Sequence, residues 1–184
     1  MTQRAGYYRV NYDARNWQLI GQQLMSKHGA ISVINRAQIM NDALNLARAG
    51  LLDYGTALDL TRYLENETDY LPWESTLVAL AHVDLMMRRT SRYGLLKVNR
   101  STVDYIRRFV NSLPCGWFQE YVSRIMSPLY RSLGFLHRNS DSHLTGKLRR
   151  KVVERLCSMG HKDCVSKAIM SYSQWMADPA GNIT

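Results

Sequence analysis

Residues 6–13, Gly-Tyr-Tyr-Arg-Val-Asn-Tyr-Asp, are followed by a chain that otherwise carries only helical patterns up to its last residue, 184. Tyr8, Val10 and Tyr12 fall on one side of a period-two alternation. Aromatic and β-branched residues in this pattern predict a half-buried β-strand. The backbone of a strand needs a neighbour for its donors and acceptors, and no later segment offers one. We therefore expect this orphan strand to complete a sheet encoded ahead of residue 1.

The remainder of the chain predicts consecutive α-helices, because apolar residues recur at intervals of three and four. The expected helices cover about residues 14–27, 35–49, 54–64, 72–93, 101–113, 117–133, 148–159 and 162–177. Asp13 and Asp53 are suitable N-caps, and Gly50 suits a helix end. We predict an all-α fold in which antiparallel helix pairs form a HEAT-like α-solenoid, preceded by the one β-strand. No clean sequence repeat accompanies these pairs, so this prediction depends on the helix pattern alone.

Several side chains have an expected structural place. The tryptophans fall on or near the apolar stripes of these helices, and we expect all four in the core: Trp17, Trp73, Trp117 and Trp175. We expect Asp42 to form a surface ion pair with Arg36 or Arg48. The stretch 65–69 is polar and predicts a break between two helices.

The composition is that of a basic globular protein. There are 24 Lys and Arg residues against 15 Asp and Glu, which gives a formal net charge of +9. The basic residues are interspersed with apolar ones, so we interpret them as solvated helix faces and expect no nucleic-acid partner. Binding to nucleic acid is the alternative, and it would weaken steeply with salt. No apolar run is long enough to span a membrane, and the first residues lack a signal-peptide core.

No residue pattern predicts catalysis by this chain. No two of its five histidines are four residues apart, so no helical turn presents a pair of zinc ligands. His137 and His143 flank a polar loop and would form a poor metal site. Cys115 has no evident histidine that would activate it as a nucleophile. We therefore predict no catalytic, cofactor-binding or metal-binding residue in this chain.

A longer set of residues resembles a known family. After residues 6–13 the chain continues with Asn16-Trp17, Asn35-Arg-Ala-Gln38, Asp42-Ala43, Leu46-Ala-Arg-Ala-Gly50, Tyr63-Leu64, Glu67 and Asp69-Tyr-Leu-Pro-Trp73. In order and spacing, these residues are similar to zinc aminopeptidases of the aminopeptidase N type, in the gluzincin family. The similarity is dense over the first half of the chain, weak over 90–147, and returns over 148–179.

The resemblance implies that this chain is part of a larger enzyme. Residues 1–13 would be the last strand of an upstream β-sandwich domain, and residues 14–184 an incomplete helical C-terminal domain. The zinc motif of the family, a His-Glu-x-x-His helix, lies in an earlier domain and is absent here. This chain would therefore be no enzyme by itself and would hold no cofactor, whereas the parent enzyme would hold zinc.

The resemblance also implies a function, partners and a location. The helical domain would enclose the active-site cavity of the parent enzyme and limit the access of peptide substrates. Its partners would be the upstream catalytic and β-sandwich domains and the peptides themselves. The parent enzyme would lie outside the cell or at its surface, anchored in the membrane through an upstream segment.

Cys157 and Cys164 are candidates for a disulfide. In one straight helix their Cα atoms would be roughly 10.5 Å apart, beyond the limit of about 7 Å for a disulfide. The helical pattern breaks at Gly160, so a turn there would let them bond; two free buried cysteines are the alternative. Members of the family at the cell surface have a similar cysteine pair followed by a Trp-Met like Trp175-Met176. This resemblance favours the disulfide and an oxidising compartment.

Two further expectations concern the chain as a whole. A solenoid without end caps leaves apolar faces open, so we expect self-association through uncapped helices. A free-standing helical-repeat interaction module or scaffold is the alternative function. An upstream His-Glu-x-x-His in the same reading frame would favour the enzyme fragment over this module.

Overall fold

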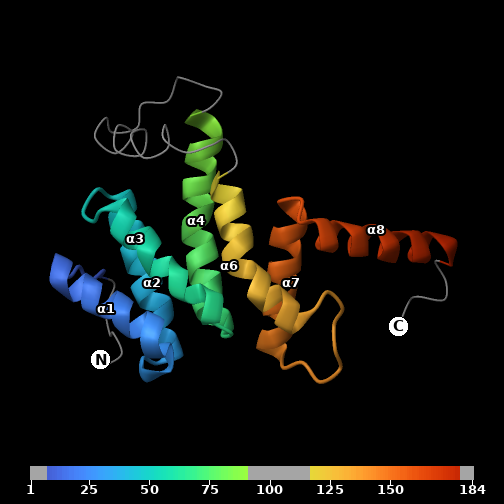
Figure 1. Ribbon diagram of the computed structural model, residues 1–184, viewed down its shortest axis with the longest axis horizontal. Helices are drawn as coiled ribbons and strands as arrows, with labels where there is room; N and C mark the ends of the chain where they lie inside the picture. Colours follow the sequence, from blue (N-terminus) through green and yellow to red (C-terminus); the bar gives the residue numbers. More distant parts are fainter. Residues whose placement is uncertain (1–7, 91–116, 179–184) are drawn as a thin grey trace. The chain divides into compact units, whose positions relative to one another are not determined.

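The computed structural model describes residues 8–90 and 117–178, and these residues are helical wherever they have regular secondary structure (Figure 1). The elements are α1 (Ala14–Lys27), η1 (His28–Ala30), α2 (Val33–Arg48), α3 (Tyr54–Thr61), η2 (Arg62–Asn66), α4 (Tyr70–Thr90), α6 (Trp117–Leu133), α7 (His143–Ser158) and α8 (Lys162–Ala177). The prediction of an all-α fold is thereby confirmed for the described part. The expected helix at 101–113, Cys115 and the side chain of Trp117 lie outside it.

Short polar side chains fix where the helices begin. The side chains of Asp13, Ser32, Asp53 and Ser142 each accept a hydrogen bond from the backbone amide three residues later. These amides have no partner within their own helix, so each cap satisfies a donor that would otherwise need water. The N-caps predicted at Asp13 and Asp53 are confirmed.

Glycine fixes the end of α2. Gly50 has a φ of 74°, in the left-handed region that other residues rarely adopt. The Leu51 amide then donates to the Leu46 carbonyl, which closes the helix in a Schellman arrangement. This turn directs the chain from α2 into α3.

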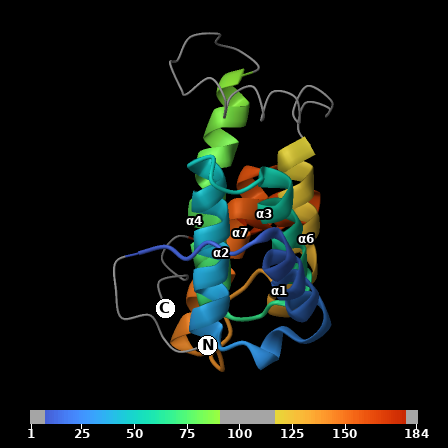
Figure 2. The same ribbon diagram turned by 90° about the vertical axis from the view of Figure 1, so that its left-hand side faces the viewer.

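The chain forms two compact units, residues 1–118 and 119–184. In the first unit α2 packs against both α4 and α3, and α1 packs against α3 (Figure 2). The largest side chains buried here are Trp17, Leu24, Met40, Tyr63, Leu64, Trp73 and Leu80. They come from α1, α2, η2 and α4, so these elements share one core. The core positions expected for Trp17 and Trp73 are confirmed.

The second unit contains most of α6, together with α7 and α8. The buried side chains of α6 include Val122, Ile125 and Met126. Those of α7 include Leu148, Val152 and Leu156, which are three or four residues apart. This spacing puts them on one face of the helix. In α8 the only buried residue is Cys164.

Two expectations about buried positions differ from the structure. Trp175 on α8 is 46% exposed rather than in the core. Among the described elements, α8 packs against α7 and makes only isolated contacts with others. Asp42 is 1% exposed rather than a surface residue, and it pairs with Arg9.

The opening stretch takes no regular secondary structure in its described part, residues 8–13. The expected β-strand, whose partner strands would lie ahead of residue 1, stays a prediction. The HEAT-like arrangement stays a prediction too, because only the packing within each unit is described.

Candidate functional site

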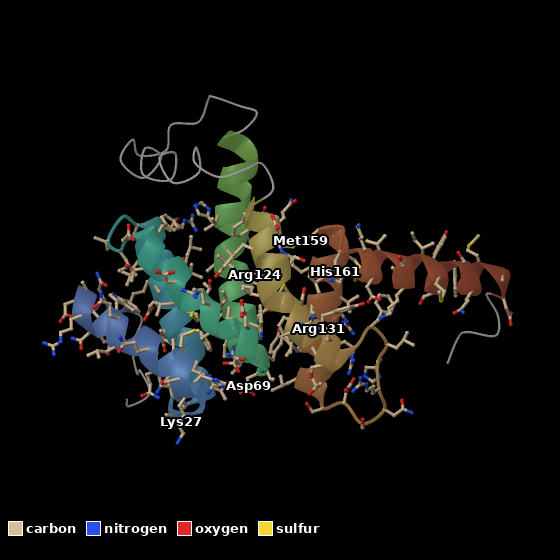
Figure 3. All side chains as sticks on the ribbon, viewed as in Figure 1. Lys27, Asp69, Arg124, Arg131, Met159 and His161 are labelled. Carbon is tan, nitrogen blue, oxygen red and sulfur yellow. A yellow bond between two sulfur atoms is a disulfide. The ribbon has the colours of Figure 1, made fainter. Side chains whose placement is uncertain are left out.

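A buried ion cluster joins α2 to the connection between η2 and α4. The Arg36 guanidinium on α2 contacts the Glu67 carboxylate, with Nε 2.7 Å from Oε2. Its Nη2 donates to Asp69 Oδ2, also at 2.7 Å. The side chains of Arg36 and Glu67 are 4% and 0% exposed, whereas that of Asp69 is 48% exposed. Asp69 is labelled in Figure 3. The buried charges of Arg36 and Glu67 therefore neutralise each other.

The cluster also satisfies backbone groups where helices end and begin. Arg36 Nη1 donates to the Ile31 carbonyl at 2.6 Å, in the connection before α2. Glu67 Oε1 accepts from the amides of Thr68 and Asp69 at 3.0 Å each. The Glu67 carbonyl accepts from the Trp73 indole at 2.9 Å. One ion pair thus ties α2 to the connection between η2 and α4.

The electrostatics of the cluster agree with its burial. Burial alone would lower the pKa of the Arg36 guanidinium, but its bonds and attraction to Glu67 outweigh this and raise that pKa. Burial, followed by the negative charge of Glu67, raises the pKa of the Tyr63 hydroxyl well above its usual value. Neither the Arg36 guanidinium nor the Tyr63 hydroxyl therefore changes its charge near neutral pH, which suits a structural role rather than acid–base catalysis.

The opening stretch docks on the same unit through its polar side chains. Arg9 contacts Asn41 and pairs with Asp42 on α2, with its Nη1 3.3 Å from Asp42 Oδ1. Asn11 donates to the Leu51 carbonyl and accepts from the Trp17 indole, both at 3.0 Å. Arg9 and Asn11 thus hold residues 8–13 against α1, α2 and the turn after α2.

In the second unit, the structure joins the two cysteines that the sequence analysis paired. Cys157 near the end of α7 and Cys164 in the first turn of α8 form a disulfide, with Cα atoms 5.2 Å apart. Gly160 lies between them with a φ of 77°, which makes the required turn. His161 caps α8 by accepting from the Cys164 amide (Figure 3). The bond therefore fixes the joint between two helices.

A polar group next to this joint also connects α6 with α8. The Tyr130 hydroxyl on α6 donates to Asp163 at 2.8 Å, and Lys167 donates to the same carboxylate oxygen at 2.7 Å. Burial, followed by the bond to Asp163, raises the pKa of Tyr130 to about 12. Tyr130 therefore stays protonated and serves as a hydrogen-bond donor rather than a base.

Beyond the joint, α8 presents an apolar stripe. Its members are three or four residues apart and lie on one side of the helix: Val165, Ala168, Ile169, Tyr172, Trp175 and Met176. Ile169, Tyr172 and Met176 are 61%, 62% and 55% exposed. This α8 stripe is an apolar surface without a cover among the described residues.

The described residues contain no group of three or more His, Cys, Asp or Glu side chains that could hold a metal ion. The His137 ring packs near Gly146, where its Nε2 would be 3.6 Å from a Cβ atom if residue 146 had one. His143 is the first residue of α7. No described helix is both long and apolar enough to cross a membrane.

Comparison with known proteins places these features in a family. The family model described as the ERAP1-like C-terminal domain matches residues 2–184. The chain belongs to this family. The resemblance to aminopeptidases of the aminopeptidase N type is thus confirmed, and the chain is a C-terminal domain of such proteins.

The individual relatives of this ERAP1-like domain agree with the family match. Aminopeptidase N of Plutella xylostella is 37% identical over 166 residues, covering 90% of this chain and 15% of that protein. The thyrotropin-releasing hormone-degrading ectoenzyme of Mus musculus is 33% identical, covering 98% of this chain and 15% of that protein. Aminopeptidase N of Homo sapiens is 33% identical, covering 96% and 16%. The chain therefore spans only about 15% of the length of these relatives.

Sequence reasoning missed the buried ion cluster, because it offered Arg36 only as one of two partners for Asp42, with Arg48 as the other, and treated 65–69 as a polar break. The signal was nevertheless available. Arg36, Glu67, Asp69 and Trp73 all belong to the short motifs on which the resemblance to aminopeptidases depends. The structure brings these four residues together, although up to 37 positions separate them.

Proposed function

We propose that this chain is a non-catalytic part of the C-terminal domain of a zinc aminopeptidase, where it encloses the active-site cavity and limits the access of peptides. The observation that carries the proposal is the family match over residues 2–184, together with relatives named as aminopeptidases. The chain spans about 15% of those relatives, so the catalytic groups would come from other domains. Its buried Arg36 and Glu67 are paired with each other, which suits a rigid wall.

We infer the domain arrangement and the location of the parent enzyme from the same family match. The upstream strand of residues 1–13 would join a β-sandwich domain, and α1 to α8 would form the first part of a HEAT-like array. The docking of Arg9 and Asn11 on α1, α2 and the turn after α2 supports a fixed junction between them. An extracellular or cell-surface location is supported by the disulfide and by the relative that is named an ectoenzyme.

A chimeric enzyme tests the proposed function. This chain would replace the matching 166 residues of the Plutella xylostella aminopeptidase N. We expect the chimera to release N-terminal residues from short peptides and to exclude folded proteins. A variant that lacks the segment should admit longer or folded substrates, or lose activity. If the deletion leaves both kcat/KM and the dependence on peptide length unchanged, the proposal is wrong.

The alternative function is a free-standing interaction module, which the α8 stripe would favour. Neither function predicts zinc-dependent release of amino acids by the purified chain, so such release would contradict both. The genomic sequence upstream decides between them, as an in-frame His-Glu-x-x-His would favour the enzyme.

A further inference from the structure

A triplet of the form Asn-x-Thr lies on the surface of the first unit, at Asn66-Glu67-Thr68. A triplet of this type, with a middle residue other than proline, is the acceptor motif for N-linked glycosylation. Two more triplets, starting at Asn99 and Asn182, fall outside the described residues. Of the three triplets, only the first lies among the described residues.

The backbone presents the two reactive residues on the same side. Asn66 is the last residue of η2, and the next residue, Glu67, is extended with a φ of −85° and a ψ of 132°. In extended backbone, successive side chains point to opposite sides. Glu67 is buried on Arg36, and Asn66 and Thr68 are both exposed. The Asn66 amide and the Thr68 hydroxyl thus stand together on the solvent side.

The ion cluster holds this geometry without using the side chains of the acceptor. Glu67 is fixed by its own carboxylate on Arg36, and the cluster uses the backbone amide of Thr68 rather than its hydroxyl. A sugar on Asn66 would therefore extend into solvent and disturb none of the buried bonds. The anchored middle residue also keeps the acceptor on the surface once the unit has folded.

We propose that Asn66 is an acceptor for N-linked glycosylation. The inference rests on the extracellular location in the proposed function, because the donor, an oligosaccharide linked to a lipid pyrophosphate, is found in the secretory pathway. The side-chain amide nitrogen of Asn66 forms a bond to the anomeric carbon of the first sugar. The bond from that carbon to the pyrophosphate oxygen breaks, the lipid pyrophosphate leaves, and the nitrogen gives up one proton to a base.

The site has a consequence for the parent enzyme. A branched, hydrated sugar on Asn66 cannot be packed against another protein domain. The surface formed by the end of η2 and by Thr68 therefore faces solvent in the whole enzyme. Any surface that lines the peptide cavity must lie elsewhere on the first unit.

The test is expression of residues 1–184 behind a cleavable signal peptide in eukaryotic cells. The signal peptide directs the chain into the secretory pathway, where the sugar donor is found. The variant Asn99→Gln/Asn182→Gln leaves Asn66 as the one remaining triplet. We expect this variant to carry one glycan, which peptide-N-glycosidase removes while converting Asn66 to aspartate. Mass spectrometry of the peptide that contains Asn66 detects that conversion.

Added substitutions provide the controls. Asn66→Gln and Thr68→Ala should each abolish the glycan, whereas Thr68→Ser should retain it. Asn139→Gln changes an exposed asparagine outside any triplet and should have no effect. Endoglycosidase H treatment of the intracellular pool reads out the transfer even if the chain is not exported. An unmodified Asn66 in that pool overturns the site, whereas the chimeric enzyme above tests the proposed function independently.

Discussion

At the scale of single residues, Arg36 matters most because its charge is buried with that of Glu67. Such a pair adds little stability compared with apolar side chains, since desolvation offsets most of the attraction. Removing one partner is different, because the other charge is then left buried alone. Arg36 also donates to backbone carbonyls before α2, so its loss would leave those acceptors without a partner.

We predict that Arg36→Met destabilises the first unit by about 3 to 5 kcal/mol, which is typical of a broken buried ion pair. Chemical denaturation followed by tryptophan fluorescence measures this, because Trp17 and Trp73 are buried in that unit. Arg15→Met is the matched control, since Arg15 is exposed on α1. Adding Glu67→Gln to Arg36→Met should restore part of the stability. If Arg36→Met and Arg15→Met lowered the stability of the first unit equally, the result would contradict the role of the cluster.

A second prediction concerns Asp141, whose carboxylate accepts from Arg149 at 2.6 Å and 2.7 Å. The bonds to Arg149 lower the pKa of Asp141 below its unfolded value. The stabilisation is therefore complete above the unfolded pKa and is lost as the pH falls through the folded pKa. Asp141→Asn should thus lower the melting temperature at pH 7 and make no difference at strongly acidic pH. Asp59→Asn, an exposed carboxylate of α3, is the control.

At the scale of elements, the joint between α7 and α8 depends on one covalent bond and one glycine. Among the described residues α8 packs mainly on α7, and Cys164 is its only buried residue. The bond closes a loop with a sequence separation of 7. In the chain-entropy model a loop of this size gives about 2.5 kcal/mol of stability.

We predict that Cys157→Ser/Cys164→Ser lowers the stability of the second unit by about 2.5 kcal/mol. Urea denaturation with and without a reducing agent measures this effect. The reducing agent should destabilise the natural chain and leave the double variant unchanged. Cys115→Ser is the control and should respond to the reducing agent as the natural chain does. If the reducing agent leaves the natural chain unaffected, the bond does not contribute as described.

The elements also show what sequence reasoning can reach. The bounds of α1, α6 and α8 agree with the expected ones, because caps and apolar spacing are local signals. α7 begins at His143, five residues earlier than expected, since Ser142 caps it ahead of its first buried residue. The partners of Arg36 and Asp42 could not be derived, because ion pairs between residues more than 30 positions apart depend on how the helices pack. The position of Trp175 depends on which elements cover α8, and α8 itself does not encode that.

At the scale of the whole molecule, the α8 stripe is the feature with the largest expected effect on behaviour in solution. Exposed apolar side chains gather along one side of a helix that has little other packing. Contiguous apolar surface of this kind marks an interface or leads to aggregation. In the proposed function this surface would be covered within the parent enzyme.

We predict that the isolated chain self-associates through the α8 stripe. Ile169→Glu/Trp175→Glu should shift its elution in size-exclusion chromatography towards the monomer, because charges in an apolar contact are costly to desolvate. Gln174→Glu adds a charge on the opposite side of α8 and serves as the control. A natural chain that elutes as a monomer at high concentration would contradict the prediction.

The bond at the joint between α7 and α8 has one more consequence, for proteolysis. Lys162, an exposed residue between the two cysteines, is a target for a trypsin-like protease. A cut there would divide the polypeptide into two pieces that still migrate together on a denaturing gel until a thiol is added. Damage from such a protease outside the cell would thus remain hidden, and α8 would stay attached to the rest of the protein.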